Sequence, residues 1–434
     1  MTTAHPEAVE RLEDAILAVA GHRVDALARL DAALAVDPEL VPALVVRGFC
    51  GALQARPEPV AVARRMAARA RDAAGRDVSE RERVLADALV AWVADRPCRS
   101  VELLERYVRD EPRDLLALKL HQSTAFFLGL SDSMVRATSR AARAWDPGVP
   151  GYGHYLGCHA FALEEAGQYG EAEPAGRAAV ELDPTDIWAG HAVAHVMDMQ
   201  GRLDEGVRWL EGLRTEYRRC DNMRLHNDWH QALLHLERGD HDLVLVLYDQ
   251  RLRGERGEDY RDLSDMATLL HRLEQEGVGV GDRWEELADY AAVRVDDHLG
   301  AFADAHYALA LAGAGRGSAL ERFVASLDVR VEEAGSTAAL LREVVAPLAR
   351  GIRDAFRGRP ELAVAHLAPV RHEVIRVGGS HVQRDVFTSV LVEAALDARR
   401  YDVADEALAE RAVRRAASPW AERRAERIPD GVQV

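Results

Sequence analysis

The feature that most constrains the fold of this chain is an internal repeat of two short helices. Its clearest copy runs from Gly153 to Pro184. Small residues stand at Ala160 and Ala172, where the two helices of a hairpin would cross, and a turn at residues 167–169 separates the helices. Pro184 closes the copy because proline cannot continue a helix. This arrangement is typical of a tetratricopeptide hairpin.

Further copies recur at a spacing of about 34 residues, which is the tetratricopeptide period. They are recognisable at residues 21–38, around Gly201, around Gly239 and at residues 308–315, and more loosely at residues 81–112. Alanine and leucine dominate the composition, and both favour helices. We therefore expect an all-α chain that forms an α-α superhelix, or solenoid, of tetratricopeptide-type helical hairpins.

Two glycine-containing stretches interrupt the repeat, at residues 250–284 and 371–381. The first is interpreted as a degenerate hairpin followed by a loop. The predicted organisation has N-terminal helical hairpins over residues 1–114, a histidine-rich superhelix continuous with them over 115–420, and a C-terminal tail over 421–434.

Composition excludes several classes of protein. The net charge of −17 argues against a nucleic-acid binder, which needs a basic face to neutralise phosphates. Lys119 is the sole lysine, so no phosphate-binding loop of the P-loop type is present. The four cysteines form no C-x-x-C pair, and no long apolar stretch suggests a membrane span. We expect a cytoplasmic protein that binds neither nucleic acid nor membrane, with terminal hairpins that could mediate a homodimer.

Histidines are the most informative residues after the repeat. The chain has 17, of which twelve lie between His121 and His306. His191 and His195, and then His226 and His230, are spaced four residues apart, and such pairs share a helix face. Counting each helix back from its turn glycine predicts that several polar side chains line one concave groove. These are His154, His191, His195, Asp198 and His226.

Several further polar residues are predicted to face the same groove. Asp304 and His306 are two residues apart on one expected helix, so they should reach different neighbours. Ser380 and Gln383 form a capping-box pattern at the start of another helix. The additional groove residues are His230, His306, His381 and Arg384.

The chemistry of this groove leaves two hypotheses open. The first is a binding scaffold that holds a peptide, a partner protein or a small molecule, since helical solenoids present extended concave surfaces. The second is a metal-dependent, hydrolase-like enzyme, because imidazole and carboxylate ligands suit divalent transition metals. His191, His195 and His226 are the predicted metal ligands. The H-E-x-x-H protease motif is incomplete because Ala192 replaces its glutamate. Asp198, Glu164 and Glu165 are candidates for the base.

The histidine-rich segments resemble those of the tetratricopeptide repeat protein 38 family. The resemblance rests on residues 191–196, 226–230, 304–306 and 379–385, and runs from about residue 115 to Ser418-Pro419-Trp420. It implies an α-α superhelix in a single chain. It implies no particular reaction, so it bears on the fold more than on the function.

Overall fold

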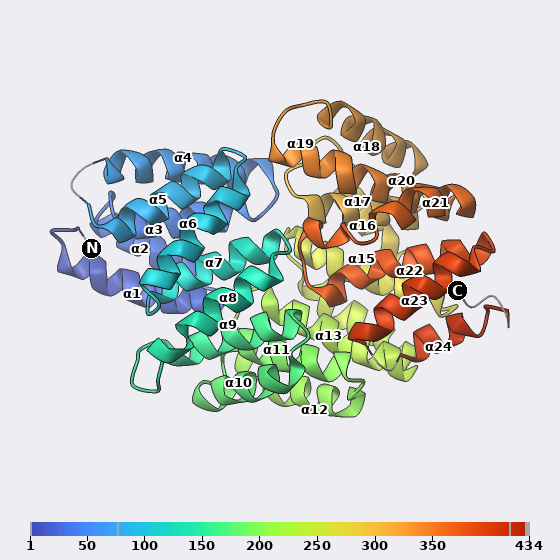
Figure 1. The fold of residues 1–434 in the computed structure, drawn as a ribbon, viewed down its shortest axis with the longest axis horizontal. Helices are drawn as coiled ribbons and strands as arrows, with labels where there is room; N and C mark the ends of the chain where they lie inside the picture. The colour runs from blue at the N-terminus through green and yellow to red at the C-terminus, as the bar shows by residue number, and fades with distance from the viewer. Residues whose placement is uncertain (1, 76–77, 416–417, 430–434) are drawn as a thin grey trace. The chain divides into compact units, whose positions relative to one another are not determined.

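The chain consists of helices joined by short connections, as seen in a computed structural model that describes residues 2–75, 78–415 and 418–429 (Figure 1). No strand occurs among these residues, and one isolated bridge joins Arg23 to Cys220. Helices that follow one another in the chain pack together in pairs, such as α9 with α10. The predicted fold class, an all-α superhelix of tetratricopeptide-type hairpins, is confirmed.

The helices fall into two compact units, 1–193 with 212–224, and 194–211 with 225–434. The predicted boundary at residue 114 separated the N-terminal hairpins from the histidine-rich superhelix on the basis of sequence, and it remains a prediction. The first unit contains α1 (Pro6–Ala20), α2 (Ala26–Val36), α3 (Val41–Ala52), α4 (Pro57–Ala74), α5 (Glu80–Val93), α6 (Pro97–Asp110), α7 (Leu115–Phe127), α8 (Ser131–Ala141), α9 (Tyr152–Glu165) and α10 (Tyr169–Leu182).

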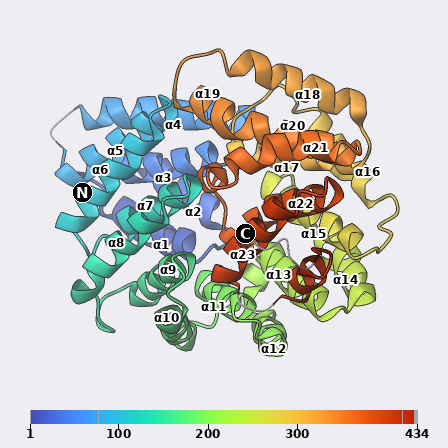
Figure 2. The same ribbon diagram turned by 45° about the vertical axis from the view of Figure 1, so that its right-hand side comes forward.

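The helix α11 (Ile187–Met199) passes from the first unit into the second. The helices that follow it are α12 (Leu203–Leu213), α13 (Met223–Arg238), α14 (His241–Leu247), α15 (Tyr260–Gln275), α16 (Arg283–Ala292), α17 (Ala301–Gly313), α18 (Gly317–Arg330), α19 (Ser336–Leu340), α20 (Ala346–Phe356), α21 (Pro360–Leu367), α22 (His381–Asp397), α23 (Tyr401–Arg414) and α24 (Pro419–Ala425). In both views of the ribbon, α22 and α23 lie side by side (Figure 2).

The turn glycines used to set the repeat register end their helices in a left-handed conformation. Gly167, Gly201 and Gly239 have φ values of 75°, 69° and 82°. At the first of these turns the amide of Gln168 donates to the carbonyl of Leu163 over 2.9 Å, which is the closing bond of a Schellman motif. Residues without a side chain adopt this conformation at little cost, so the glycines fix where each first helix of a hairpin stops.

Small residues allow the helices to approach closely, as the repeat predicts. A Cβ atom built on Gly206 of α12 would lie 2.8 Å from the Leu234 side chain of α13. Ala194, Leu210 and Leu234 form one buried apolar cluster at this crossing. The packing of α11, α12 and α13 therefore depends on a position that no larger residue fits, and it sets the positions of the histidines on α11 and α13.

The interrupted stretch at residues 250–284 is more regular than predicted. A π-helical turn spans Tyr248–Arg253, and α15 is a full helix of 16 residues rather than part of a degenerate hairpin. The glycines at 277 and 281 lie after α15, in the loop that leads to α16. Almost all of α15 is buried, and polar residues such as Asp262 and Asp265 are buried with it. The many polar residues of α15 suggested an exposed segment, whereas the helix is buried.

In the first unit, residues of the 212–224 segment return to the first hairpin. The amide of Asp221 donates to the carbonyl of His22 over 2.7 Å, and the amide of Val24 donates to Arg219 over 2.9 Å. The single lysine is buried here, with Lys119 Nζ lying 3.4 Å from His22 Nε2 and 4.4 Å from the centre of the Trp188 ring. The position of Lys119 is thus explained by an internal cation–π contact.

Among the described residues, no helix combines the length and the apolar character that crossing a bilayer requires.

Candidate metal centre

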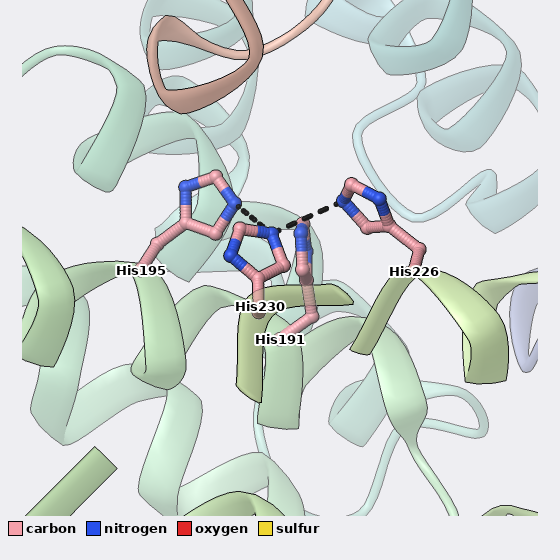
Figure 3. A group of neighbouring side chains, drawn as sticks. All are labelled: His191, His195, His226 and His230. Carbon is pink, nitrogen blue, oxygen red and sulfur yellow. Dashed lines mark hydrogen bonds between the residues drawn. The ribbon is translucent and has the colours of Figure 1, made fainter. Parts of the chain in front are cut away.

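Histidines of α11 and α13 gather at one point of the second unit (Figure 3). One ring nitrogen from each of His195, His226 and His230 lies within 4.8 Å of the others. His191 and His195 are one turn apart on α11, and His226 and His230 are one turn apart on α13. The paired spacing seen in the sequence therefore does place imidazoles together.

Three of these rings meet through the same type of nitrogen. The Nε2 atoms of His195 and His230 are 3.0 Å apart, and those of His230 and His226 are 3.2 Å apart. We call these residues the triad. Figure 3 shows the Nε2 atom of His230 between the other two. His195 and His230 are buried, and the side chain of His226 is 12% exposed.

The tautomer of His226 is set by a carboxylate behind it. Asp265, on the neighbouring helix α15, accepts a hydrogen bond of 2.7 Å from Nδ1 of His226. Because Nδ1 carries the proton, the lone pair of the neutral ring is on Nε2, which faces His230. A carboxylate that orients a histidine in this way is the usual outer partner of a metal-binding imidazole.

Asp265 is itself held by the first turn of α22. The side-chain amide of Gln383 donates to the second carboxylate oxygen of Asp265 over 3.0 Å. The orientation of that amide is fixed, because its oxygen accepts the backbone N–H of Ser380 over 3.0 Å in the predicted capping box. A chain of hydrogen bonds thus runs from the N-terminus of α22 through Asp265 to the triad. The predicted capping box of Ser380 and Gln383 is confirmed.

Aromatic rings complete the surroundings of the triad. Trp229 lies with its ring centre 4.7 Å from that of His230 and 5.2 Å from that of His226, and it is fully buried. His381, at the start of α22, presents its edge to His195 with ring centres 5.6 Å apart. These contacts restrict the rotamers of the imidazoles, as a preformed metal site requires.

The other predicted site residues have partners of their own. Nδ1 of His154 donates to the carboxylate of Asp186 over 3.0 Å in the first unit. Asp198, a candidate base, is in a buried ion pair of 2.6 Å with Arg415. Arg384 donates to the carbonyl of Gly379. These contacts give each residue a structural role, and their part in a site stays a prediction.

His306 and Asp304 point to different neighbours, as their spacing predicts. Nδ1 of His306 donates to the carbonyl of Phe302 over 2.7 Å, whereas Asp304 lies 3.3 Å from His298. Burial lowers the pKa of His306 to about 4 and raises the pKa of Asp304. His306 is therefore a neutral, buried side chain at physiological pH.

Asp265 and Gln383, which are linked to the triad by hydrogen bonds, were not among the residues predicted to line the groove. Asp265 is 39 residues from His226 in the chain, and Gln383 is 118 residues from Asp265. No local spacing links them. The sequence offered one signal for Asp265, which is an acidic residue directly before a largely apolar stretch of the expected helix. The signal for Gln383 was its capping-box pattern with Ser380.

Comparison with known proteins adds little to this geometry. No family model matches the chain. Among solved structures, the chain is similar to one titled "Structure of Naa15/Naa10 bound to HypK-THB", with 13% identity and a TM-score of 0.32, over 99% of this chain and 71% of that one. A likeness at that TM-score carries no inference about function. The resemblance to the tetratricopeptide repeat protein 38 family stays a prediction.

Proposed function

We propose that this helical-repeat protein binds a divalent transition-metal ion at the triad of His195, His226 and His230. The observation that carries the proposal is the convergence of three Nε2 atoms at 3.0 and 3.2 Å. Zinc binds imidazole nitrogen at about 2.0–2.1 Å in a tetrahedron, so two nitrogens on one ion lie about 3.3 Å apart. Two of the three Nε2 separations in the triad, at 3.0 and 3.2 Å, are close to that value.

Hydrogen bonding alone accounts poorly for the triad. With the proton of His226 on Nδ1, its Nε2 is an acceptor in the neutral ring, and His230 Nε2 can donate to only one of its two neighbours. A cation at this point would satisfy every Nε2 lone pair.

The ligand set that we propose differs in one residue from the set predicted by sequence. His230 replaces His191 as the third ligand, because its Nε2 is in contact with both other nitrogens. His191 lies one turn before His195 on α11 and contacts Phe161 and Trp188. With three protein ligands, a zinc ion would keep one coordination position open for a further ligand. A divalent ion held by these residues would supply Lewis-acid chemistry.

Elemental analysis of protein purified without an affinity tag tests the proposal. We expect about one equivalent of zinc, iron, nickel or copper per chain, consistent with imidazole ligation. The double variant His195→Ala/His230→Ala should lose this metal. His235→Ala is the matched control, because His235 is on the same helix as His230 but pairs with Asp240 over 2.9 Å. Equal metal content in the double variant and the control would contradict the proposal.

The second hypothesis, a scaffold for a peptide, partner protein or small molecule, is compatible with a bound ion. The repeat fold supports it in general terms, because solenoids present extended surfaces. The buried state of His195 and His230 argues against these two residues contacting a peptide directly.

A further inference from the structure

An arginine-rich pocket lies in the second unit, where the start of α22 meets α23. It has a volume of about 470 Å³, within the range of small-molecule sites. Five arginines line it, against two carboxylates, in a chain whose net charge is −17. We call it the arginine pocket. Its charged lining residues are Arg371, Arg384, Arg411, Arg414, Arg415, Asp385 and Glu410.

Buried ion pairs hold the arginines beside this pocket. Asp385 is shared by two guanidinium groups, at 2.8 Å from Arg411 and 3.2 Å from Arg272. Both arginine side chains are more than nine-tenths buried. Their charges hold the pKa of Asp385 well below its usual range. Arg415, the next buried arginine of the lining, pairs with Asp198 at 2.6 Å and with Glu237 at 3.4 Å, so the buried arginines beside the pocket are matched by carboxylates.

Arg411 also has donor capacity that the protein does not use. Its Nε and one terminal nitrogen bind Asp385, but its other terminal nitrogen, NH1, is buried without a hydrogen-bond partner among the described residues. A buried guanidinium N–H left unpaired is costly. Because Arg411 lines the pocket, an anion inside it could accept this hydrogen bond.

The apolar residues of the lining indicate what kind of anion would fit the pocket. Met199, Val374, Ile375, Val382 and Val413 give the pocket apolar walls beside the arginines. A bare inorganic ion would leave these walls unused, whereas an organic anion would cover them. His381 also lines the pocket, and it is the residue whose ring edge faces His195 of the triad.

We infer that the arginine pocket binds a small organic anion, with a phosphate or carboxylate group held by the arginines and an apolar body against the walls. Guanidinium groups bind both oxyanions through paired hydrogen bonds. His381 places the pocket next to the triad, so the anion is a candidate for the ligand or substrate of the proposed metal centre. Anion binding itself does not depend on the metal.

The test measures binding to chelator-treated, metal-free full-length protein by isothermal titration calorimetry. The probes are inorganic phosphate, phenyl phosphate, 4-phenylbutyrate and the neutral 4-phenylbutan-1-ol, at constant ionic strength. We expect saturable binding of phenyl phosphate or 4-phenylbutyrate, whichever carries the preferred acid group, weaker binding of inorganic phosphate, and none of the alcohol.

The variants keep the buried arginines intact so that folding is preserved. Arg371→Gln/Arg414→Gln removes two lining charges on the more exposed side of the pocket and should weaken anion binding on the order of tenfold per guanidinium. Arg400→Gln is the control, because Arg400 pairs with Asp402 outside the pocket lining. The inference is overturned if no anion binds saturably, or if binding is equal in the double variant and the control. Metal content, measured separately, decides the metal proposal alone.

Discussion

Asp265 contacts the triad through a single hydrogen bond to His226. Replacing Asp265 therefore tests how the orientation of His226 affects metal binding while all three proposed ligands are kept. Asp265→Asn keeps the size of the side chain but removes the charge that favours a proton on Nδ1 of His226. We expect metal affinity to fall about 10- to 100-fold, as is usual for outer partners of metal-bound histidines. Competition with a chromogenic chelator measures this affinity.

The matched control for Asp265 is another histidine–aspartate pair in the same unit. Asp240 lies 2.9 Å from His235 at the end of α13, and Asp240→Asn removes the same type of charge. Its metal affinity should equal that of the unmodified protein. An equal loss in both variants would mean that general charge, rather than the orientation of His226, governs binding.

The burial of His306 should make the stability of the folded protein depend on pH. Its folded-state pKa is lowered to about 4 by burial, against 6.5 for an exposed histidine. The unfolded chain therefore binds the proton more readily, so stability from this residue is complete above pH 6.5 and is lost as the pH falls toward 4. The loss amounts to about 3 kcal/mol at most.

The contribution of His306 is isolated by substitution. His306→Phe keeps a ring between Phe302 and Phe387, which contact it with ring centres 4.1 and 5.1 Å away. The decrease in the free energy of unfolding between pH 6.5 and 4 should be smaller in this variant. Chemical denaturation at several pH values measures it, and identical slopes would show that His306 is not buried in its neutral form.

At the scale of elements, the first turn of α22 links helix capping to the metal centre. Ser380→Ala removes the cap that accepts the Gln383 N–H and should lower stability by about 1 kcal/mol. It should also weaken metal binding, because Gln383 loses the fixed geometry through which it holds Asp265. Calorimetry and chelator competition measure the two effects.

A second capping box provides the comparison for Ser380. Ser79 and Glu82 form the same motif at the start of α5 in the first unit. Ser79→Ala should cost a similar amount of stability and leave metal affinity unchanged. If both variants bound metal as tightly as the unmodified protein, the link between α22 and the triad would be only structural.

At the scale of the whole molecule, the sequence predicted what is local and missed what is distant. Turn glycines such as Gly167 and small residues such as Ala160 are short-range signals, so the all-α hairpin fold could be predicted. The pairing of His226 with His230 followed from helix spacing. The contact between Asp265 and His226 and the lining of the arginine pocket join residues that are distant in the sequence. No periodic pattern in the sequence predicts such contacts.

The central claim is that three histidine Nε2 atoms hold one metal ion. X-ray absorption spectroscopy of the zinc-loaded protein tests it most directly, with the His195→Ala/His230→Ala variant measured alongside. We expect about three imidazole nitrogens at about 2.0–2.1 Å from the zinc, with the scattering pattern of histidine rings, and the absence of this signal in the variant. A first shell of water oxygens alone, or the same spectrum in both proteins, would contradict it.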